Sequence, residues 1–189
     1  IYRSVPFGRL ANLYLLDARQ YKDRQVCTKD GRRGSGTVNP RHCPQWNDPK
    51  RSMLGQAQEQ WLEQELGQQG AAGVTWNVLG QQTLLGQRDF RPGPEQFLWN
   101  DGWDGYAGAR QRLTGTLQRQ AASNPVFLGG DVHEHWVGHV KADYASTNSA
   151  NVGVEFCGTS ITSRSGGNGK LAERLAESFF GTADWMRNR

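Results

Sequence analysis

The sequence predicts an α/β fold, because short apolar runs alternate along the chain with longer segments of helical periodicity. Interleaved strands and helices of this kind are typical of α/β proteins, in which helices pack against a sheet. Clusters of Gly, Pro and charged residues separate the segments and mark the loops between them. The expected order is β-α-β-α-β-β-β-α, and a chain of 189 residues fits one domain or part of a larger one.

The first half of the chain predicts a strand, a long loop and a helix. Residues 10–16 form a mostly apolar run, which indicates a strand. Residues 22–51 are rich in Gly, Pro and charge, and loops of this length are usually functional or disordered. Ser52 can cap the helix that follows, and Gly67 and Gly70 are expected to end it. The residues at helical spacing on this segment are Leu54, Gln58, Trp61, Leu62 and Leu66.

The second half predicts one more strand and helix, followed by three successive strands. Apolar and polar residues alternate at 74–78, as expected for a strand. After a loop at 86–105, residues 106–122 return to helical periodicity, and Asp104 can cap this helix. The remaining expected elements are strands beginning at 125, 136 and 152, a polar loop at 158–169 and a helix at 171–180.

The composition is typical of a globular protein. Hydrophobic residues make up 36% of the chain, and no stretch reaches the roughly 18 apolar residues that indicate a membrane span. The formal net charge of +4 could steer phosphate esters by long-range attraction, or it could reflect an ordinary solvated surface. Together with seven Trp, the charge also permits a module that binds nucleic acid or polyphosphate, because basic grooves with stacking rings bind single strands.

Two of the three cysteines are expected to form a disulfide. Cys27 and Cys43 lie 16 positions apart and bracket the polar loop, and closing such a loop would stabilise the fold by roughly 3 kcal/mol. The alternatives are two unpaired thiols, or a metal site in the loop with His42. A disulfide indicates an oxidising compartment. We therefore expect a periplasmic or secreted protein, although the sequence contains no signal peptide.

The stretch 125–136 carries the most specific functional pattern. It begins as an apolar run that predicts a buried strand, and Gly129 and Gly130 then let the backbone turn sharply. Asp131 and His133 follow at the carboxyl end of this strand, where open α/β sheets bind their ligands. A carboxylate beside an imidazole suits a divalent or trivalent metal that accepts an oxygen ligand. The alternative is a turn Asp and a hydrogen-bonded His without a ligand.

Six segments, in order along the chain, carry a family resemblance. They are LLDARQY at 15–21, MLG with Gln58, Trp61 and Leu62 at 53–62, WNVLGQQ at 76–82, WDGY with Arg110 at 103–110, GGDVH at 129–133 and EFCGTSIT at 155–162. This ordered set resembles the PhoD-type alkaline phosphatases, which are calcineurin-like metallophosphoesterases. The last metal motif of that superfamily is Gly-His-x-His, and Asp replaces the first His in the PhoD type.

The resemblance implies a fold, a reaction and cofactors. The implied fold is a partial metallophosphoesterase-type sandwich, in which helices flank a mixed β-sheet. Residues 1–189 would be the C-terminal portion of a PhoD-like domain, without the upstream motifs that carry the family's other metal ligands. The implied reaction is hydrolysis of phosphate mono- or diesters by a metal-bound hydroxide, with metals that stabilise the attacking and leaving oxygens. The implied metals are calcium and iron, and Asp131 and His133 would each serve one of two neighbouring metals.

Four further side chains are candidates for the site. His135 could donate to a phosphate oxygen or protonate a leaving group, or it could be a surface histidine. Arg19 could clamp phosphate with two parallel hydrogen bonds. Asp17 follows the same strand, and both residues could instead form an internal ion pair that braces the loop. Gln82 could hydrogen-bond a ligand or orient a metal ligand, or it could tie down its own loop.

Two functions from other classes stay open beside hydrolysis. The chain could be a non-catalytic fragment, because two ligands without the others make a weak and open metal site. It could also be the phosphate- or nucleic-acid-binding module that the charge and the Trp content permit. If the chain is instead part of a phosphatase, nucleic acid is only a possible substrate. The sequence does not determine the preferred ester, the metal or the oligomeric state.

Overall fold

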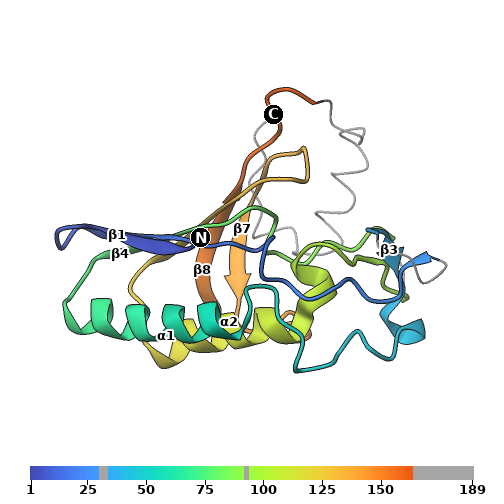
Figure 1. Cartoon of the computed structure of the whole chain (residues 1–189), viewed down its shortest axis with the longest axis horizontal. Coiled ribbons are helices and arrows are strands. Elements are labelled where there is room, and N and C mark those ends of the chain that lie inside the picture. Colours follow the sequence, from blue (N-terminus) through green and yellow to red (C-terminus); the bar gives the residue numbers. More distant parts are fainter. Residues whose placement is uncertain (30–33, 92–93, 164–189) are drawn as a thin grey trace.

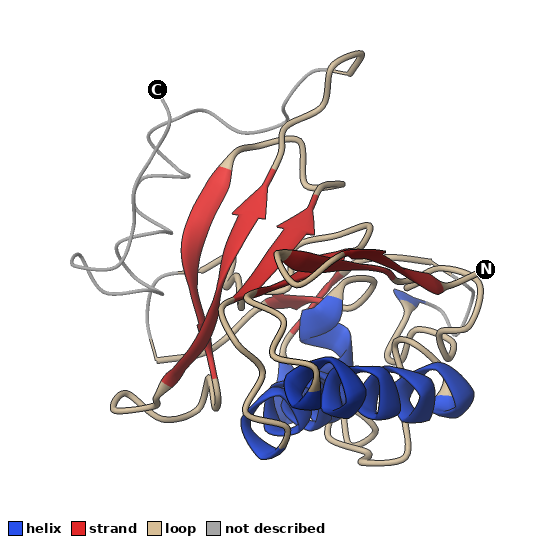
Figure 2. Cartoon of the chain, turned by 90° about the vertical axis from the view of Figure 1, so that its left-hand side faces the viewer, coloured by secondary structure: helices blue, strands red, loops and turns tan. Residues whose placement is uncertain are grey.

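In the part of the chain that the structure describes, a six-stranded mixed β-sheet has two α-helices packed against one face (Figure 1 and Figure 2). The computed structural model describes residues 1–29, 34–91 and 94–163. The strand order in the sheet is β1-β2-β4-β6-β8-β7. These strands are β1 (Arg3–Phe7), β2 (Ala11–Leu15), β4 (Trp76–Gly80), β6 (Pro125–Gly129), β7 (Trp136–Lys141) and β8 (Asn151–Cys157), and β3 (Thr37–Val38) pairs separately with β5 (Leu98–Trp99).

The four central strands run parallel, so their carboxyl ends meet at one edge of the sheet. β2, β4, β6 and β8 pair parallel with one another, whereas β1 and β7 are antiparallel at the two edges. Helix α1 (Gln56–Ala71) lies between β2 and β4 in the chain, and helix α2 (Ala107–Arg119) lies between β4 and β6. Parallel strands need such crossover connections. The predicted α/β fold, with a mixed sheet flanked by helices, is therefore confirmed.

The hydrophobic core lies between the sheet and the two helices. Alternate residues of the central strands, such as Tyr14 and Phe127, are completely buried and pack with Leu62 of α1 and Leu113 of α2. Burial of one such side chain stabilises the fold by about 1.5–3 kcal/mol. On the opposite face of the sheet, apolar side chains stay accessible, and Phe156 of β8 is 47% exposed. Both helices therefore cover the same face of the sheet (Figure 2).

Helix α1 begins and ends later than the sequence indicated. Gly55 precedes its first turn with a φ of 77°, a conformation that favours glycine. Ser52 does not cap the helix, because its hydroxyl accepts a hydrogen bond from the N–H of Gly55 at 2.7 Å, one turn earlier. Gly67 and Gly70 lie inside the helix instead of ending it. A Cβ on Gly67 would come within 2.9 Å of Oε1 of Gln120, so the missing side chain lets the end of α2 approach.

Helix α2 follows a short 3-10 turn, η3 (Trp103–Tyr106), and Asp104 does not cap it. The carboxylate of Asp104 is buried. It accepts a hydrogen bond from the guanidinium of Arg110 at 2.6 Å and one from the backbone N–H of Arg88 at 2.9 Å. The predicted N-cap was therefore wrong, because this carboxylate is used to neutralise a buried arginine and to hold the loop before the helix.

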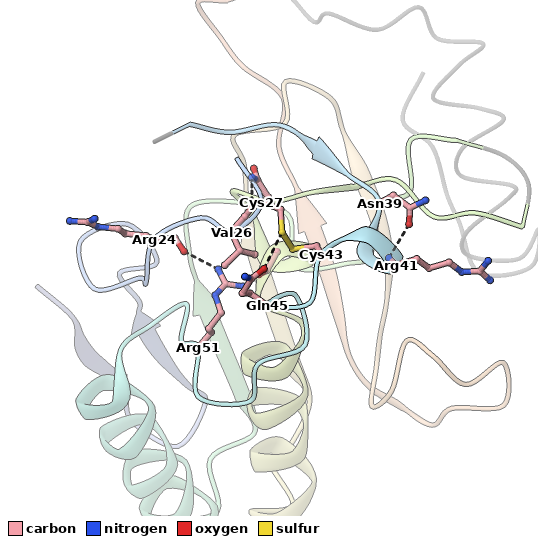
Figure 3. The surroundings of a disulfide bond; sticks show 10 residues. Arg24, Val26, Cys27, Asn39, Arg41, Cys43, Gln45 and Arg51 are labelled. Carbon is pink, nitrogen blue, oxygen red and sulfur yellow. Dashed lines mark hydrogen bonds between the residues drawn. A yellow bond between two sulfur atoms is a disulfide. The ribbon is translucent and has the colours of Figure 1, made fainter. Parts of the chain in front are cut away.

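The long loop at 22–51 is closed by a disulfide between Cys27 and Cys43 (Figure 3). The predicted bond is confirmed, and it excludes the alternative in which these two sulfurs bind a metal as thiolates. Near the end of the loop, the guanidinium of Arg51 donates a hydrogen bond to the carbonyl oxygen of Arg24 at 3.0 Å. A covalent bond and a charge-assisted hydrogen bond therefore fold this polar loop back on itself.

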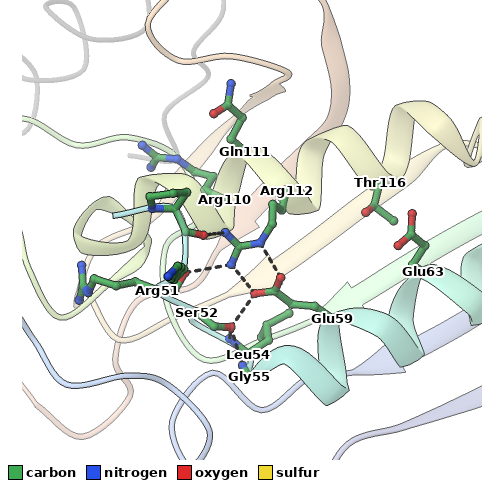
Figure 4. Close-up of polar contacts among 12 residues, drawn as sticks. Arg51, Ser52, Leu54, Gly55, Glu59, Glu63, Arg110, Gln111, Arg112 and Thr116 are labelled. Atoms are coloured by element: carbon green, nitrogen blue, oxygen red, sulfur yellow. Dashed lines mark hydrogen bonds and ion pairs between the residues drawn. The ribbon is translucent and has the colours of Figure 1, made fainter. Parts of the chain in front are cut away.

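Arg112 of α2 ties the two helices and the end of the loop together (Figure 4). Its guanidinium donates to both carboxylate oxygens of Glu59 on α1, at 2.7 and 2.8 Å. It also donates to the carbonyl oxygens of Pro49 at 2.5 Å and Arg51 at 2.9 Å. Paired, charge-assisted bonds of this kind fix orientation as well as supplying energy. They therefore fix the position of α1 relative to α2.

Some predicted elements lie outside the described residues. The helix expected at 171–180 falls there, as does the end of the loop expected at 158–169. Within 34–51, the predicted loop contains a short 3-10 turn, η2 (Pro40–His42), beside β3. Among the described helices, none combines the length and the apolar character that crossing a membrane requires.

Candidate active site

A cavity of about 580 Å³ opens at the carboxyl ends of the central strands. Segments that follow β2, β4 and β6 contribute to its lining: Arg19, Thr83, Leu84, Asp131, Val132, His133 and Glu134. Ligands bind at this edge in open α/β sheets, and the volume is typical of a small-molecule site. The structure therefore brings together three of the residues that the sequence predicted, Arg19, Asp131 and His133.

The turn after β6 presents Asp131 and His133 through an uncommon backbone conformation. Both residues have a positive φ, 72° for Asp131 and 60° for His133. Few residues other than Gly adopt this region, although Asp and His do so more readily than most. Gly129 permits the close approach of the segment after β4, since a Cβ there would lie 2.5 Å from the carbonyl oxygen of Thr83. Strained backbone of this kind is concentrated at functional sites.

Arg19 holds Asp131 through an ion pair. Nη2 of Arg19 lies 2.6 Å from Oδ2 of Asp131, and Nη1 lies 2.8 Å from Oδ2 of Asp101. Asp101 is anchored in turn by an ion pair with Lys22 and by the side-chain amide of Gln25, which donates at 2.5 Å. Burial disfavours the charged guanidinium, but the two carboxylates outweigh this effect and raise the pKa of Arg19. The geometry agrees with the alternative in which Arg19 forms an internal ion pair.

Asp17 and Gln82 bind main-chain groups beside the cavity. Oδ1 of Asp17 accepts hydrogen bonds from the N–H groups of Arg19 at 3.0 Å and Gln20 at 2.9 Å. Burial would raise the pKa of Asp17, but these backbone N–H groups lower it below its usual value. The amide of Gln82 both donates to and accepts from the main chain of 16–18, at 2.7 Å each. Both side chains therefore shape the loop that carries Arg19, and their contact with a ligand stays a prediction.

His135 is exposed on the turn after β6 and does not line the cavity. The preceding residue, Glu134, does line it and forms an ion pair with Arg88 at 3.2 Å. The guanidinium carbon of Arg88 lies 4.6 Å from the ring centre of Phe90 and 5.1 Å from that of Trp136. Burial lowers the pKa of Arg88, against the opposing effect of Glu134. The proton-donor role of His135 stays a prediction from the sequence.

The side chains in the cavity fit part of a metal centre. Asp131 and His133 supply a carboxylate and an imidazole, donors that suit a cation accepting oxygen and nitrogen ligands. Within residues 1–29, 34–91 and 94–163, no group of three or more His, Cys, Asp or Glu side chains is arranged to hold a metal ion. Well-formed metal centres use three or more protein ligands. The described part of the chain therefore contains donor groups that suit a metal, but they do not form a complete centre.

Comparison with known proteins identifies the family. The model of the "PhoD-like phosphatase" family matches residues 1–185. This chain belongs to the PhoD-like phosphatase family. It is 38% identical over 169 residues to alkaline phosphatase D of Bacillus subtilis (strain 168). It also matches a solved structure of PhoD with a TM-score of 0.77 and 34% sequence identity. The mixed sheet is therefore the PhoD-like fold.

The chain corresponds to a minor part of each of these PhoD proteins. The match to alkaline phosphatase D covers 89% of this chain and 27% of the Bacillus protein. The structural match covers 94% of this chain and 32% of the solved PhoD chain. The likeness therefore applies to the region described above and not to the whole length of the relatives.

The cavity contains residues that the sequence did not single out. Asp101 binds Arg19 across 82 positions of sequence, and no local pattern indicates such a pairing. Phe90 and Trp99 also line the cavity, from the segment 86–105, which was predicted only as a loop. The one available signal was the position of Asp101 two residues before the WDGY segment, which belongs to the family resemblance.

Proposed function

We propose that this chain is part of a PhoD-type alkaline phosphatase or phosphodiesterase, which hydrolyses phosphate mono- or diesters with the help of bound metal ions. The observation that carries the proposal is the placement of Asp131 and His133 in one cavity with Arg19, at the carboxyl ends of parallel strands. The family supports the same reaction class, because one relative is named alkaline phosphatase D.

Asp131 and His133 would hold metal ions in this cavity, together with ligands from outside the described residues. Bound cations would act as Lewis acids on the phosphate oxygens and would lower the pKa of the attacking water. The family resemblance implies calcium and iron, and the carboxylate of Asp131 agrees with cations that prefer oxygen ligands. We expect this chain alone to bind metal weakly, because the described residues provide only part of a ligand set.

The main role proposed for Arg19 is to orient Asp131. Its guanidinium binds Oδ2 at 2.6 Å, so that Oδ1 can turn toward a cation. Groups that hydrogen-bond a metal ligand and fix its direction commonly change metal affinity or activity by about 10- to 100-fold. Each terminal nitrogen of Arg19 carries two N–H groups, so the same guanidinium could also donate to a phosphate oxygen.

Three other predicted residues have supporting roles in this proposal. Asp17 and Gln82 would fix the main chain on both sides of Arg19, since both bind backbone groups there. His135 would protonate the leaving group, and an imidazole has a suitable pKa for this step near neutral pH. The disulfide supports a periplasmic or secreted location, because such bonds persist in oxidising compartments.

The ligand assignment is tested by Asp131→Asn in the protein at its natural length. The amide keeps the size of the carboxylate and removes its charge, so metal content and turnover should each fall by more than about tenfold. Metal is measured by elemental analysis, and turnover is measured with p-nitrophenyl phosphate and bis(p-nitrophenyl) phosphate. Asp48→Asn, at an exposed loop carboxylate, is the matched control. Full metal content with unchanged turnover in Asp131→Asn would overturn the assignment.

A further inference from the structure

The cavity is larger than a phosphate group requires, and part of its lining is aromatic. Its volume of about 580 Å³ lies in the range of sites that enclose whole organic ligands. Charged residues such as Arg19 and Asp131 line it, and so do the rings of Phe90 and Trp99. The same cavity therefore offers groups that suit a phosphate ester's charge and surfaces that suit an apolar substituent.

Among the described residues, the rings of Phe90 and Trp99 lie outside the buried hydrophobic clusters. By contrast, Trp46, Trp103 and Trp136 are each buried in a hydrophobic cluster. Within the described part of the chain, neither Phe90 nor Trp99 belongs to such a cluster, and both are only partly buried. Their ring centres lie 6.3 Å apart, with planes inclined by 42°. Both rings therefore keep accessible surface in the cavity.

Hydrogen bonds in the surrounding backbone hold both rings in place. The N–H of Phe90 donates to the carbonyl oxygen of Phe97 at 2.9 Å, and the carboxylate of Asp89 accepts from the N–H of Phe97 at 2.8 Å. Trp99 lies in β5, where it pairs with Thr37 of β3. A ligand would therefore meet rings that are already positioned, which lowers the entropic cost of binding.

We propose that Phe90 and Trp99 form a subsite for a flat aromatic ring carried by the phosphate ester. The inference rests on the proposed phosphatase function, because the phosphate group is what brings the ester to this cavity. A flat π-system stacks favourably on protein rings, and one such contact changes affinity by roughly tenfold or more. The favoured ligands are therefore aryl esters or nucleotides, in preference to alkyl esters of equal charge.

Equilibrium binding of matched esters tests the subsite without requiring turnover. The probes are phenyl phosphate, adenosine 5′-monophosphate and ethyl phosphate, which all carry a phosphate monoester group. Their dissociation constants for the 189-residue chain are measured by ligand-observed NMR in buffer containing calcium. We expect at least one aromatic ester to bind about tenfold more tightly than ethyl phosphate. The tighter of the two aromatic probes identifies an aryl or a nucleotide ligand, and equal constants for all three overturn the proposal.

Variants that lack one of the two rings show whether Phe90 and Trp99 cause the tighter binding of aromatic esters. Trp99→Leu and Phe90→Leu keep apolar volume and lose the flat ring, so each should reduce the aromatic preference toward unity, whereas Trp99→Tyr should retain most of it. Trp76→Leu and Phe7→Leu are matched controls, because these rings are 43% and 56% exposed away from the cavity. Circular dichroism melting verifies the fold of each variant. A preference that survives both Trp99→Leu and Phe90→Leu contradicts the subsite.

The subsite and the phosphatase function fail in distinguishable ways. Aromatic preference in binding, without hydrolysis of any ester by the natural-length protein, would contradict the phosphatase function and support the subsite. Hydrolysis without any aromatic preference in binding would contradict the subsite and leave the proposed phosphatase function supported.

Discussion

Glu155 of β8 is buried beneath the loop that lines the cavity, and its ionisation should make stability depend on pH. Its side chain is 4% exposed, and its two oxygens accept hydrogen bonds from the N–H groups of Leu85 at 2.6 Å and Gly86 at 2.8 Å. Burial raises the pKa of Glu155 to about 7, against the opposing effects of those N–H groups and Arg110, and Asp104 adds to the rise.

The shifted pKa of Glu155 fixes both the sign and the size of the effect. The folded protein holds the proton of Glu155 more tightly than the unfolded chain does. Protonated Glu155 therefore stabilises the folded state, and this contribution to the free energy of unfolding is complete below pH 4.5. It declines as the pH rises to about 7 and changes little above that. A rise from 4.5 to about 7 corresponds to a loss of up to about 3 kcal/mol across this window.

Glu155→Gln should remove this pH dependence. The amide oxygen can still accept one N–H bond, but the amide nitrogen cannot accept the other, which costs about 1–3 kcal/mol near pH 5. The difference in stability between the wild type and this variant should then shrink or reverse between pH 5 and pH 8. Urea unfolding followed by circular dichroism measures it, with Glu63→Gln on the exposed face of α1 as the control. A constant difference across this range would refute the reasoning.

The remaining predictions concern the segments that hold Arg19. Burial alone would raise the pKa of the Asp101 carboxyl, but its contacts with Lys22, Arg19 and Gln25 lower that pKa below its usual value. The stability that these contacts give the folded protein is therefore complete above about pH 4, and it is lost as the pH falls through the pKa of Asp101 in the folded state. Asp101→Asn should therefore cost about 1–2 kcal/mol in urea unfolding at pH 7, and progressively less as the pH falls below about 4. Replacing Cys27 and Cys43 together by Ser should cost about 3 kcal/mol, and dithiothreitol should lower the wild-type melting temperature comparably; equal stability of both forms would count against this loop-closure contribution.

The central strands could be predicted because their burial is visible in the local sequence. β2, β4, β6 and β8 are apolar or alternating runs, as half-buried and buried strands require. β1 could not be identified in the same way, since its sequence RSVPF contains a proline, which sheets tolerate at an edge. β3 and β5 have two residues each, too few for any periodicity.

Only the part of the candidate site that comes from one continuous segment of the chain could be predicted from the sequence. Asp131 and His133 could be placed at the end of a strand, and the cavity is there. The ion pairs of Arg19 connect it with Asp101 and Asp131 over 82 and 112 positions, and only the parallel arrangement of the strands brings these segments together. Sequence spacing contains no information about such pairs, so the distinction between a phosphate clamp and an internal ion pair required the fold.

The backbone at the end of β6 agrees with the proposed metal-binding role of Asp131 and His133. Glycine occupies position 129, where a Cβ would lie 2.5 Å from the carbonyl oxygen of Thr83 and no other residue fits. It does not occupy the two positions with φ of 72° and 60°, although glycine would relieve the strain at both. The geometry of the turn alone therefore does not explain why Asp131 and His133, and not glycine, occupy these two positions. Their side chains line the cavity, and the proposed metal-binding role would account for non-glycine residues at two positions where glycine would be less strained.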